Sequence, residues 1–307
     1  MWFFYAMLTM AFWGTADLFY KTGADEEEKY SHLRTSVSVG IVMGVHAIIT
    51  LIFGNVGYDF RNMLVYLPVS FMYILSMTVG YFGLRYLELS ISSPIQNTSG
   101  ALVSLLCFFI LGQKLDIISG VGIIFICIGV FLLGLLEKNK ENEIPESKKY
   151  KIGFIAFFMP IIYCVIDSLG TFFDAYYLDS IEKTPLLCVS ENTLEDVANI
   201  SYELTFFAFA IILSLYLFAI KKQKIVLHGS KSRLSAALFE TGGQFVYVRA
   251  MSGNGVVAAP MIASYSIVSV ILSRLFLKEK LTKTQYFIIS IVIFGIVLLG
   301  VSEGLAE

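Results

Sequence analysis

Three acidic residues, Asp17, Asp167 and Glu240, stand inside long apolar stretches of the chain. An ionised carboxylate at membrane depth is costly unless it is protonated, paired or turned toward a water-filled cavity. No basic residue accompanies these acids at a similar depth. We therefore predict that they bind a cationic substrate and exchange it for protons. Asp17, near the end of its stretch, has the alternative role of marking the membrane interface.

Two polar residues stand at helical spacing from the third acid. Glu240 and Gln244 lie four residues apart, which places them on one face of a helix, and Tyr247 extends that face. An acid beside an amide and a phenol suits the recognition of a polar substrate. A hydrogen-bonded contact between two helices is the structural alternative.

Further candidates follow a proline or are aromatic. Gln96 and Asn97 follow Pro94 within three residues, and a proline ring frees backbone carbonyls within a helix. Trp13 and Tyr163 can enclose a cation or serve packing alone. The predicted substrate-binding residues are therefore Trp13, Asp17, Gln96, Asn97, Tyr163, Asp167, Glu240, Gln244 and Tyr247, and Asp17, Asp167 and Glu240 are also the predicted proton-coupling residues.

The elements that carry these residues are predicted to be membrane helices. The chain is 57% hydrophobic and 15% charged, with a mean hydropathy of +0.75, which excludes a soluble globular protein. Bilayer hydrocarbon is roughly 30 Å thick, so a helix needs about 20 apolar residues to cross it. Such stretches occur at residues 2–20, 35–53, 64–84, 91–111, 116–136, 151–177, 202–220, 234–251, 256–277 and 284–302.

Motifs of soluble enzymes are missing from the sequence. It has no phosphate-binding lysine loop and no histidine cluster with metal-ligand spacing. We therefore expect no enzymatic activity, no metal and no cofactor. The expected partners are a small-molecule substrate, protons and membrane lipids, with no nucleic acid, and the expected assembly is a monomer or a homodimer.

The chain contains an internal repeat. A shift of 166 residues matches Pro94 with Pro260, Lys114 with Lys280, Gly129 with Gly295, Gly134 with Gly300 and Glu137 with Glu303, without a gap. A shift of 150 residues aligns Asp17 with Asp167 in the first helix of each half. A duplicated membrane unit predicts a transporter whose binding site lies between its halves.

The basic residues occur almost entirely in alternate loops. Of the 22 Lys and Arg residues, only Arg61, Lys114, Lys183 and Arg249 fall in the other set of loops. The positive-inside rule then places the basic loops in the cytoplasm and both termini outside. Because each half has an odd number of helices, the second half must be inverted. The predicted fold is an all-α integral membrane protein with ten transmembrane helices as two inverted five-helix repeats.

The predicted domain boundaries follow from the repeat. Residues 1–137 form the first five-helix repeat, residues 138–150 a charged linker, and residues 151–307 the second repeat. An acidic loop inserted at 178–200 has no counterpart in the first half. It reads as a tolerated surface insertion, with a gate or a cation funnel as the alternative.

Short motifs connect the chain to a known family. Phe12-Trp13-Gly14 stands in the first helix, and residues 81–86 precede the fourth. Residues 277–282 look like a short Gly-Glu-x-Leu-Thr loop in which Lys278 replaces the Gly, and the first half has Gln113 in place of the Glu. On these motifs the chain resembles EamA-type members of the drug/metabolite transporter superfamily. Thr98 and Ser264 stand where that family often places a mid-helix proline.

The resemblance implies two inverted five-helix repeats around a central cavity that opens alternately to each side. It also implies cytoplasmic termini, against the charge distribution. We expect a proton-coupled secondary active transporter of a small cationic or zwitterionic metabolite, amine-like or amino-acid-like, in the cell membrane. The alternatives are a facilitative carrier of a neutral solute, such as a sugar or nucleoside, and a non-transporting membrane scaffold that handles lipid.

Overall fold

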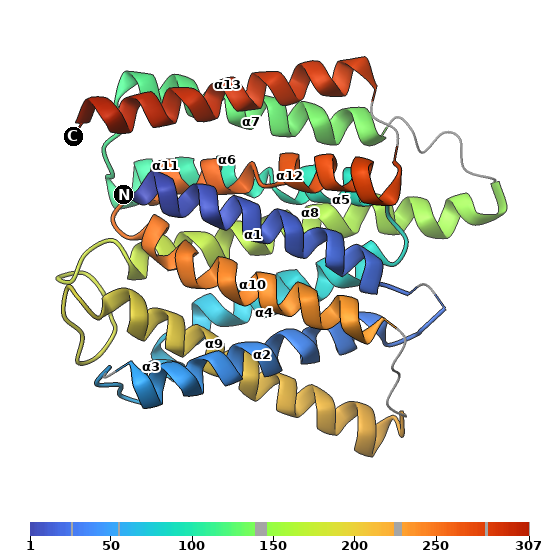
Figure 1. Cartoon of the computed structure of the whole chain (residues 1–307), viewed down its shortest axis with the longest axis horizontal. Helices are drawn as coiled ribbons and strands as arrows, with labels where there is room; N and C mark the ends of the chain where they lie inside the picture. Colours follow the sequence, from blue (N-terminus) through green and yellow to red (C-terminus); the bar gives the residue numbers. More distant parts are fainter. Residues whose placement is uncertain (26, 55, 139–145, 224–228, 280–281, 307) are drawn as a thin grey trace.

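The computed structural model describes residues 1–306 except 26, 55, 139–145, 224–228 and 280–281. Over these residues it contains helices and connecting loops but no strand. The helices lie side by side, with the two chain ends at the same end of the bundle (Figure 1).

The helices follow one another in two comparable series. The first series is α1 (Trp2–Gly23), α2 (Ser31–Phe53), α3 (Asn62–Val65), α4 (Leu67–Leu84), α5 (Leu89–Gln96), α6 (Ser99–Leu106), the π-helical turn η1 (Cys107–Leu111) and α7 (Ile117–Lys138). The second is α8 (Glu146–Tyr177), α9 (Leu194–Leu215), η3 (Tyr216–Ile220), α10 (Ser230–Met251), α11 (Gly255–Ala263), α12 (Ser266–Leu272), η4 (Ser273–Leu277) and α13 (Lys283–Ala306).

Six helical segments are long and apolar enough to cross a membrane. They are Ser31–Phe53, Leu67–Leu84, Ser92–Leu111, Phe158–Tyr177, Leu194–Ile220 and Gly255–Leu277. Two shorter apolar helices, Ile117–Leu132 and Lys283–Leu299, pair with each other through α7 and α13. An all-helical membrane protein is thus what the structure supports, while the count of ten spans stays a prediction.

The predicted spans at 2–20 and 234–251 correspond to α1 and α10, which are not among those six segments. These two helices pack against each other. They carry Asp17 and Glu240, which lower the mean hydropathy of each helix. A polar face turned toward another helix, rather than toward lipid, explains why these helices need less apolar sequence.

Corresponding helices of the two series run in opposite directions. In Figure 1, α1, α4 and α7 run from left to right, whereas α8, α10 and α13 run from right to left. The pairing of helices follows the same relation, because α1 packs against α10 and α8 packs against α4.

Two of the predicted spans are each broken in the middle. α5 ends before Asn97 and α6 begins at Ser99, while α11 ends before Ser264 and α12 begins at Ser266. These breaks fall at the places where the sequence lacks the family's mid-helix proline. Each follows a proline by about one turn, because Pro94 and Pro260 lie inside α5 and α11.

A proline also leaves the carbonyl four residues earlier without its helical partner. For Pro260 that carbonyl belongs to Val256, and Ser104 of α6 donates its hydroxyl to it at 2.8 Å. The broken helices of the two halves are thereby joined where α6 ends and α11 begins.

Several predicted boundaries differ from the structure. α9 begins at Leu194, so the end of the predicted insertion 178–200 is helical, because Leu194, Val197 and Ile200 are apolar, buried and helically spaced. Glu195 and Asp196 in its first turn also favour a helix start there. α8 begins at Glu146, five residues before the predicted second repeat. Most of the predicted linker, 139–145, lies outside the described residues.

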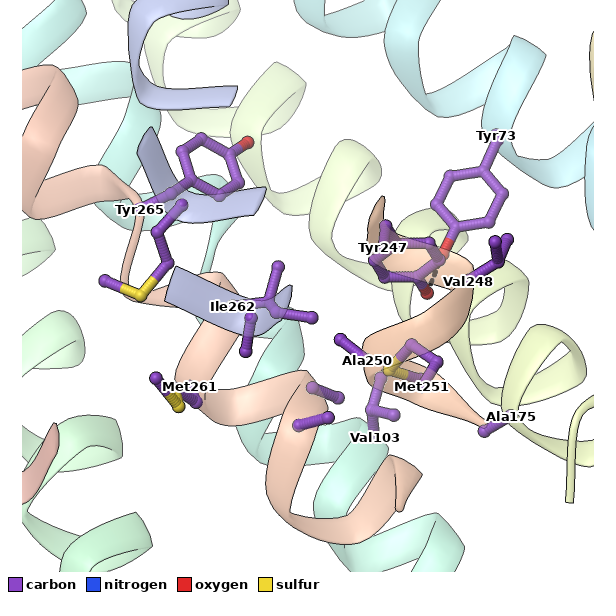
Figure 2. Close-up of a cluster of buried hydrophobic side chains, with 14 of the residues drawn as sticks. Tyr73, Val103, Ala175, Tyr247, Val248, Ala250, Met251, Met261, Ile262 and Tyr265 are labelled. Carbon is purple, nitrogen blue, oxygen red and sulfur yellow. Dashed lines mark hydrogen bonds between the residues drawn. The ribbon is translucent and has the colours of Figure 1, made fainter. Parts of the chain in front are cut away.

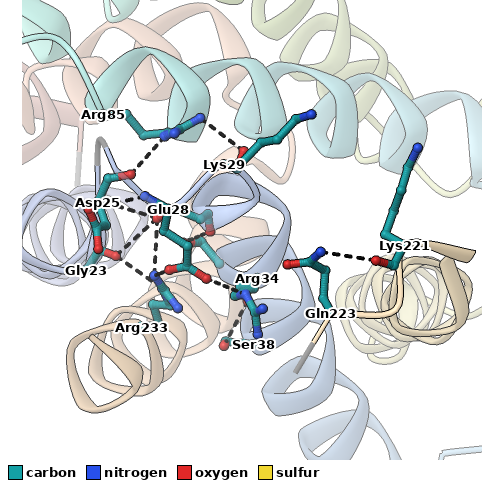
Figure 3. A network of polar contacts seen from close by, with 12 residues as sticks. Gly23, Asp25, Glu28, Lys29, Arg34, Ser38, Arg85, Lys221, Gln223 and Arg233 are labelled. Atoms are coloured by element: carbon teal, nitrogen blue, oxygen red, sulfur yellow. Dashed lines mark hydrogen bonds and ion pairs between the residues drawn. The ribbon is translucent and has the colours of Figure 1, made fainter. Parts of the chain in front are cut away.

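A network of charged residues ties the helix ends together where α1 ends and α2 begins (Figure 3). Arg233 at the start of α10 is only 2% exposed; it donates to the Gly23 carbonyl at 3.1 Å and to Glu28 at 2.5 Å. Arg34 of α2 forms an ion pair with the same Glu28. Arg85, after α4, donates to the carbonyl of Asp25 at 2.9 Å.

Candidate substrate site

A central cavity lies among α1, α4, α5, α6, α8, α9, α10 and α11. It encloses about 800 Å³ not filled by protein atoms, part of it open to the outside. All of the predicted substrate-binding residues except Gln244 line it.

Asp17 on α1 connects two broken helices. Its Oδ2 accepts hydrogen bonds from Ser93 of α5 and from Ser269 of α12, each at 2.7 Å. The two serines come from different halves of the chain. The Asp17 carboxylate is therefore hydrogen-bonded inside the bundle, which argues against the alternative that it only marks the membrane interface.

Asp167 on α8 occupies the corresponding place in the second half. Its Oδ2 accepts a hydrogen bond from Ser99, the first residue of α6, at 2.8 Å. The hydroxyl comes from just beyond the break between α5 and α6, so the break determines where this donor lies. Both aspartates thus reach toward broken helices at the cavity wall.

Glu240 on α10 lines the same cavity, and a tyrosine hydroxyl is hydrogen-bonded to its carboxylate. Tyr20 donates its hydroxyl to Glu240 Oε2 at 3.1 Å, and the Tyr20 ring lies 4.5 Å from the Tyr81 ring. Trp13 donates its indole N–H to the Glu240 backbone carbonyl at 3.4 Å. The third carboxylate is therefore placed by contacts between α1 and α10.

The amides at the first helix break make local hydrogen bonds. Gln96 donates through Nε2 to Ser92 Oγ at 2.9 Å, and Asn97 donates through Nδ2 to the Ser93 carbonyl at 2.9 Å. Both residues line the cavity. Their bonds to α5 hold them in place, and they sit beside the serine that binds Asp17.

Gln244 is the predicted residue that the structure does not bring to the cavity. It is fully buried, and neither its amide oxygen nor its amide nitrogen has a hydrogen-bond partner among the described residues. A helix turns about 100° per residue, so Gln244 is rotated about 40° from Glu240, while Tyr247 is rotated about 20° the other way. That difference explains why Tyr247 lines the cavity with Glu240 and Gln244 does not.

Aromatic side chains form much of the wall. They are Trp13, Tyr20, Tyr73, Tyr81, Tyr163, Tyr202, Tyr247 and Tyr265. The Trp13 ring lies 4.9 Å from that of Tyr247 and 5.9 Å from that of Tyr265. Figure 2 shows Tyr247 beside Tyr73, with Tyr265 and Ile262 across from them.

Glycines on neighbouring helices make room for two of these rings. A Cβ on Gly243 of α10 would lie 2.4 Å from Trp13 Cδ1, and one on Gly80 of α4 would lie 2.9 Å from Tyr163 Cδ2. Because Trp13 and Tyr163 are matched by the shift of 150 residues, the two contacts are equivalent in the two halves. Each ring therefore stands against a helix of the other half.

Sequence reasoning missed two buried acids. Asp174 stands seven residues after Asp167 on α8, a spacing that places both on one face and was available as a signal. Glu203 on α9 contacts Nδ1 of His46 on α2 at 2.8 Å with each carboxylate oxygen. The occurrence of Glu203 inside an apolar stretch was its only sequence signal.

No group of three or more His, Cys, Asp or Glu is arranged to hold a metal ion in the part of the chain that the structure describes. The cavity instead combines carboxylates, phenols, an indole and amides. Such a set binds polar or cationic organic molecules by charge, hydrogen bonding and aromatic contact.

Comparison with known proteins identifies the family. A model described as the EamA-like transporter family matches residues 1–135 and 189–301, most of the chain. The chain belongs to the EamA-like transporter family. The resemblance seen in the sequence motifs is thereby confirmed, and so is the expectation of a transporter rather than an enzyme.

Other comparisons add the fold but no function. One solved structure, described as "Crystal structure of protein", superposes with a TM-score of 0.68 over 100% of this chain and 98% of its own, at 11% sequence identity. At that identity the likeness shows the fold alone. The curated proteins include no match to this chain. Membership of the EamA-like family indicates a multi-pass membrane transporter with a small-molecule substrate.

Proposed function

We propose that this protein is a secondary active transporter of a small cationic or zwitterionic metabolite, an amine or amino-acid-like compound, exchanged against protons. The lining of the cavity carries the proposal. It holds Asp17, Asp167 and Glu240, and none of the described residues that line it is Lys, Arg or His. An organic cation would neutralise this surplus of acid and would be attracted to the aromatic faces around it.

The hydrogen bonds of the three acids suit an exchange of protons for cations. Each acid accepts a hydrogen bond from a hydroxyl group. The donors are Ser93 and Ser269 for Asp17, Ser99 for Asp167, and Tyr20 for Glu240. Because a hydroxyl both donates and accepts, it can stay bonded to a carboxyl group in either protonation state. The same carboxylate can then hold a proton in one step and a cation in the next.

The proposal assigns different roles to the cavity residues. Asp167 and Glu240 are the main proton and cation sites, Asp17 is their weaker partner, and Gln96, Asn97, Tyr247, Trp13 and Tyr163 position the substrate. Gln244 is left out, because it does not line the cavity.

We propose ten membrane-spanning helices in two inverted five-helix repeats, residues 1–137 and 151–307, that rock against each other around the cavity. The opposite directions of corresponding helices support this arrangement (Figure 1). The equivalent contacts of Trp13 with Gly243 and of Tyr163 with Gly80 support it as well. Contacts that are equivalent in two halves allow two states of similar energy, as alternating access requires.

The distribution of basic residues supports an orientation in the cell membrane. The end of the bundle with Arg34, Arg85 and Arg233 would face the cytoplasm, and both termini would lie outside. Labelling of single engineered cysteines at positions 59 and 223 with a membrane-impermeant reagent in intact cells tests this. Reaction at 59 and not at 223 is the expected result.

Uptake into proteoliposomes tests the function. The panel would contain ethanolamine, choline, putrescine, alanine, glucose and uridine, each with and without a pH gradient. We expect accumulation of an amine or amino acid that depends on the gradient, and loss of that accumulation to the level of empty liposomes in Asp167→Asn. Asp59→Asn, in an exposed loop ion pair with Arg61, is the matched control that should transport normally. Wild-type accumulation by Asp167→Asn would contradict the coupling role.

A carrier of neutral solutes is the second candidate, and one contact favours it. Asp17 already accepts two serine hydroxyls, much as it would accept the hydroxyls of a sugar. Uptake of glucose or uridine without proton movement would support this candidate. Binding of lipid with no flux of any solute in the panel would instead support a scaffold.

A further inference from the structure

Asp174 is a buried acid that stands apart from the cavity site. Its side chain is 0% exposed, and it is not among the residues that line the cavity. It lies on α8 seven residues after Asp167, about 10 Å further along the helix axis. It is therefore closer to the end of the bundle that carries the loop at 178–193, which follows α8.

The two oxygens of Asp174 have different surroundings. Tyr66, the residue before α4, donates its hydroxyl to Oδ1. Oδ2 is buried and accepts no hydrogen bond. If Asp174 were ionised, Oδ2 would carry negative charge without a hydrogen-bond donor, which is costly away from water.

The groups that face Asp174 are phenols. They come from α4 and its start (Tyr66 and Tyr73), from α9 (Tyr202) and from α10 (Tyr247). Tyr177, on α8 itself, packs its ring 5.2 Å from that of Tyr66. Within the described part of the chain, no Lys, Arg or His side chain forms an ion pair with Asp174. Among these residues, an ionised Asp174 would therefore have no ion-pair partner.

Hydroxyl groups connect this layer to the cavity. The hydroxyls of Tyr247 and Tyr73 lie 2.8 Å apart, and the Tyr73 hydroxyl also lies 2.8 Å from Thr171 Oγ1. Figure 2 shows the Tyr247 and Tyr73 side chains next to each other. Tyr73, Thr171 and Tyr247 all line the cavity. Since each hydroxyl both donates and accepts, the chain can pass a proton by reorienting its bonds.

We propose that Asp174 is a second proton-binding site, which holds a proton on Oδ2 in this conformation and exchanges it with the cavity through the hydroxyls of Tyr247, Tyr73 and Thr171. A proton on Oδ2 makes that unpartnered atom a donor, and the Tyr247 phenol is a hydrogen-bonding neighbour of the Asp174 carboxyl group. No other reactant is required, because the step moves a proton between oxygen atoms. The coupling of this site to transport rests on the proposed function, whereas proton binding at Asp174 does not.

Infrared difference spectroscopy of the purified protein tests the proposal without a substrate. A protonated carboxyl group has a carbonyl band that a carboxylate lacks. At neutral pH we expect Asp174→Asn to lose one component of this band, and Asp167→Asn to keep that component. An unchanged carbonyl band in Asp174→Asn would overturn the proposal.

Two phenol variants decide the matter if Asp174→Asn does not fold. Tyr66→Phe removes the donor to Oδ1, and Tyr247→Phe removes a second hydroxyl that neighbours the carboxyl group, so each should shift the Asp174 component in frequency. Tyr81→Phe, a cavity phenol that bonds neither oxygen, is the matched control and should leave it in place. A component unmoved by both Tyr66→Phe and Tyr247→Phe would overturn the proposal. If no amine or amino acid in the uptake panel were transported, the proposed function would be wrong, but the carbonyl band of Asp174 would still be expected.

Discussion

Gln113 and Glu279 each cap a broken helix that belongs to the other half of the chain. Gln113 Oε1 accepts a hydrogen bond from the Val256 amide at 2.8 Å, and Glu279 Oε2 accepts one from the Ser90 amide at 3.3 Å. The shift of 166 residues relates Gln113 to Glu279 and Ser90 to Val256. Both contacts satisfy amides that a helix start leaves without partners, so the same contact, made twice, fastens the two halves together.

Substitutions should affect the two caps differently, because the Gln113 side chain also makes a second hydrogen bond. Its Nε2 donates to Asp179 Oδ1 at 2.7 Å. We predict that Gln113→Glu sets two carboxylates against each other and lowers the free energy of unfolding by about 1–3 kcal/mol at neutral pH. Glu279→Gln keeps its acceptor oxygen and should change it by less than about 0.5 kcal/mol.

Thermal unfolding of the purified variants measures this difference. The penalty of Gln113→Glu should shrink in acid, since a protonated carboxyl can donate where the amide did. Equal melting temperatures for Gln113→Glu and the wild type at neutral pH would contradict the cap geometry.

The residues before these caps predict a stabilising substitution. Gly112 and Lys278 are also related by the shift of 166, and both adopt left-handed backbone conformations, with φ of 67° and 60°. That region costs a residue with a Cβ about 1–2 kcal/mol, while glycine loses extra chain entropy of roughly 0.5–1 kcal/mol on folding. Lys278→Gly should therefore raise stability by about 1 kcal/mol, and Gly112→Ala should lower it by a similar amount. A lower melting temperature for Lys278→Gly would be the contrary result.

Sequence patterns located the helices well, since membrane-crossing length and apolar composition set them. The first helix was predicted at 2–20 and is found at Trp2–Gly23, and the predicted stretch 116–136 is found at Ile117–Lys138. The helix breaks were less accessible. Pro94 and Pro260 pointed to them, but their position also depends on partners such as Ser104, which is 152 residues from the carbonyl it binds.

The site was predictable only in part, for similar reasons. A buried carboxylate is conspicuous in apolar sequence, so Asp17, Asp167 and Glu240 stood out. The serines that bind the aspartates did not, because a serine in a membrane helix has many possible partners. Ser269 lies 252 residues from Asp17, and only the folded chain brings the two together. Helix geometry alone, with its 100° step, would have separated Gln244 from Tyr247.

Packing of the cavity wall predicts a contrast between two glycines of α4. A Cβ on Gly80 would lie 2.9 Å from the Tyr163 ring, whereas one on Gly83 would meet nothing closer than Met159 Cβ at 3.5 Å. Gly80→Ala should displace Tyr163, lower stability by about 1–3 kcal/mol and reduce uptake. Gly83→Ala should be neutral or stabilising by about 0.5–1 kcal/mol, because alanine favours a helix.

Melting temperatures and uptake rates of the two alanine variants test this contrast side by side. Gly243→Ala, which crowds Trp13 more closely at 2.4 Å, should behave like Gly80→Ala and not like Gly83→Ala. Similar losses in Gly80→Ala and Gly83→Ala would show that the ring contact is not the cause.

The loop before α7 predicts a dependence of stability on pH. Asp116 Oδ2 accepts the amides of Ile118 and Ser119 at the helix start, and its Oδ1 accepts the Ser302 hydroxyl of α13. Burial raises the pKa of Asp116, but the hydrogen bonds from Ser119, Ser302 and Ile118 outweigh it, so this pKa lies below its ordinary value. A carboxyl group with a lowered pKa stabilises the fold above its unfolded-state pKa, and this contribution is lost as the pH falls through the folded-state value.

Asp116→Asn keeps a capping oxygen but removes the charge at the helix start, which is worth about 0.3–1 kcal/mol. The wild type should therefore melt above Asp116→Asn at pH 7, and the gap should narrow as the pH falls below the unfolded-state pKa of about 3.9 toward the lower folded-state pKa. Melting temperatures of both proteins at several pH values between these limits give the curve. Asp59→Asn is an unsuitable control, because the pKa of Asp59 is itself lowered by Arg61. A gap between wild type and Asp116→Asn that stayed constant down to pH 3 would mean that the side chain acts through packing and not through its charge.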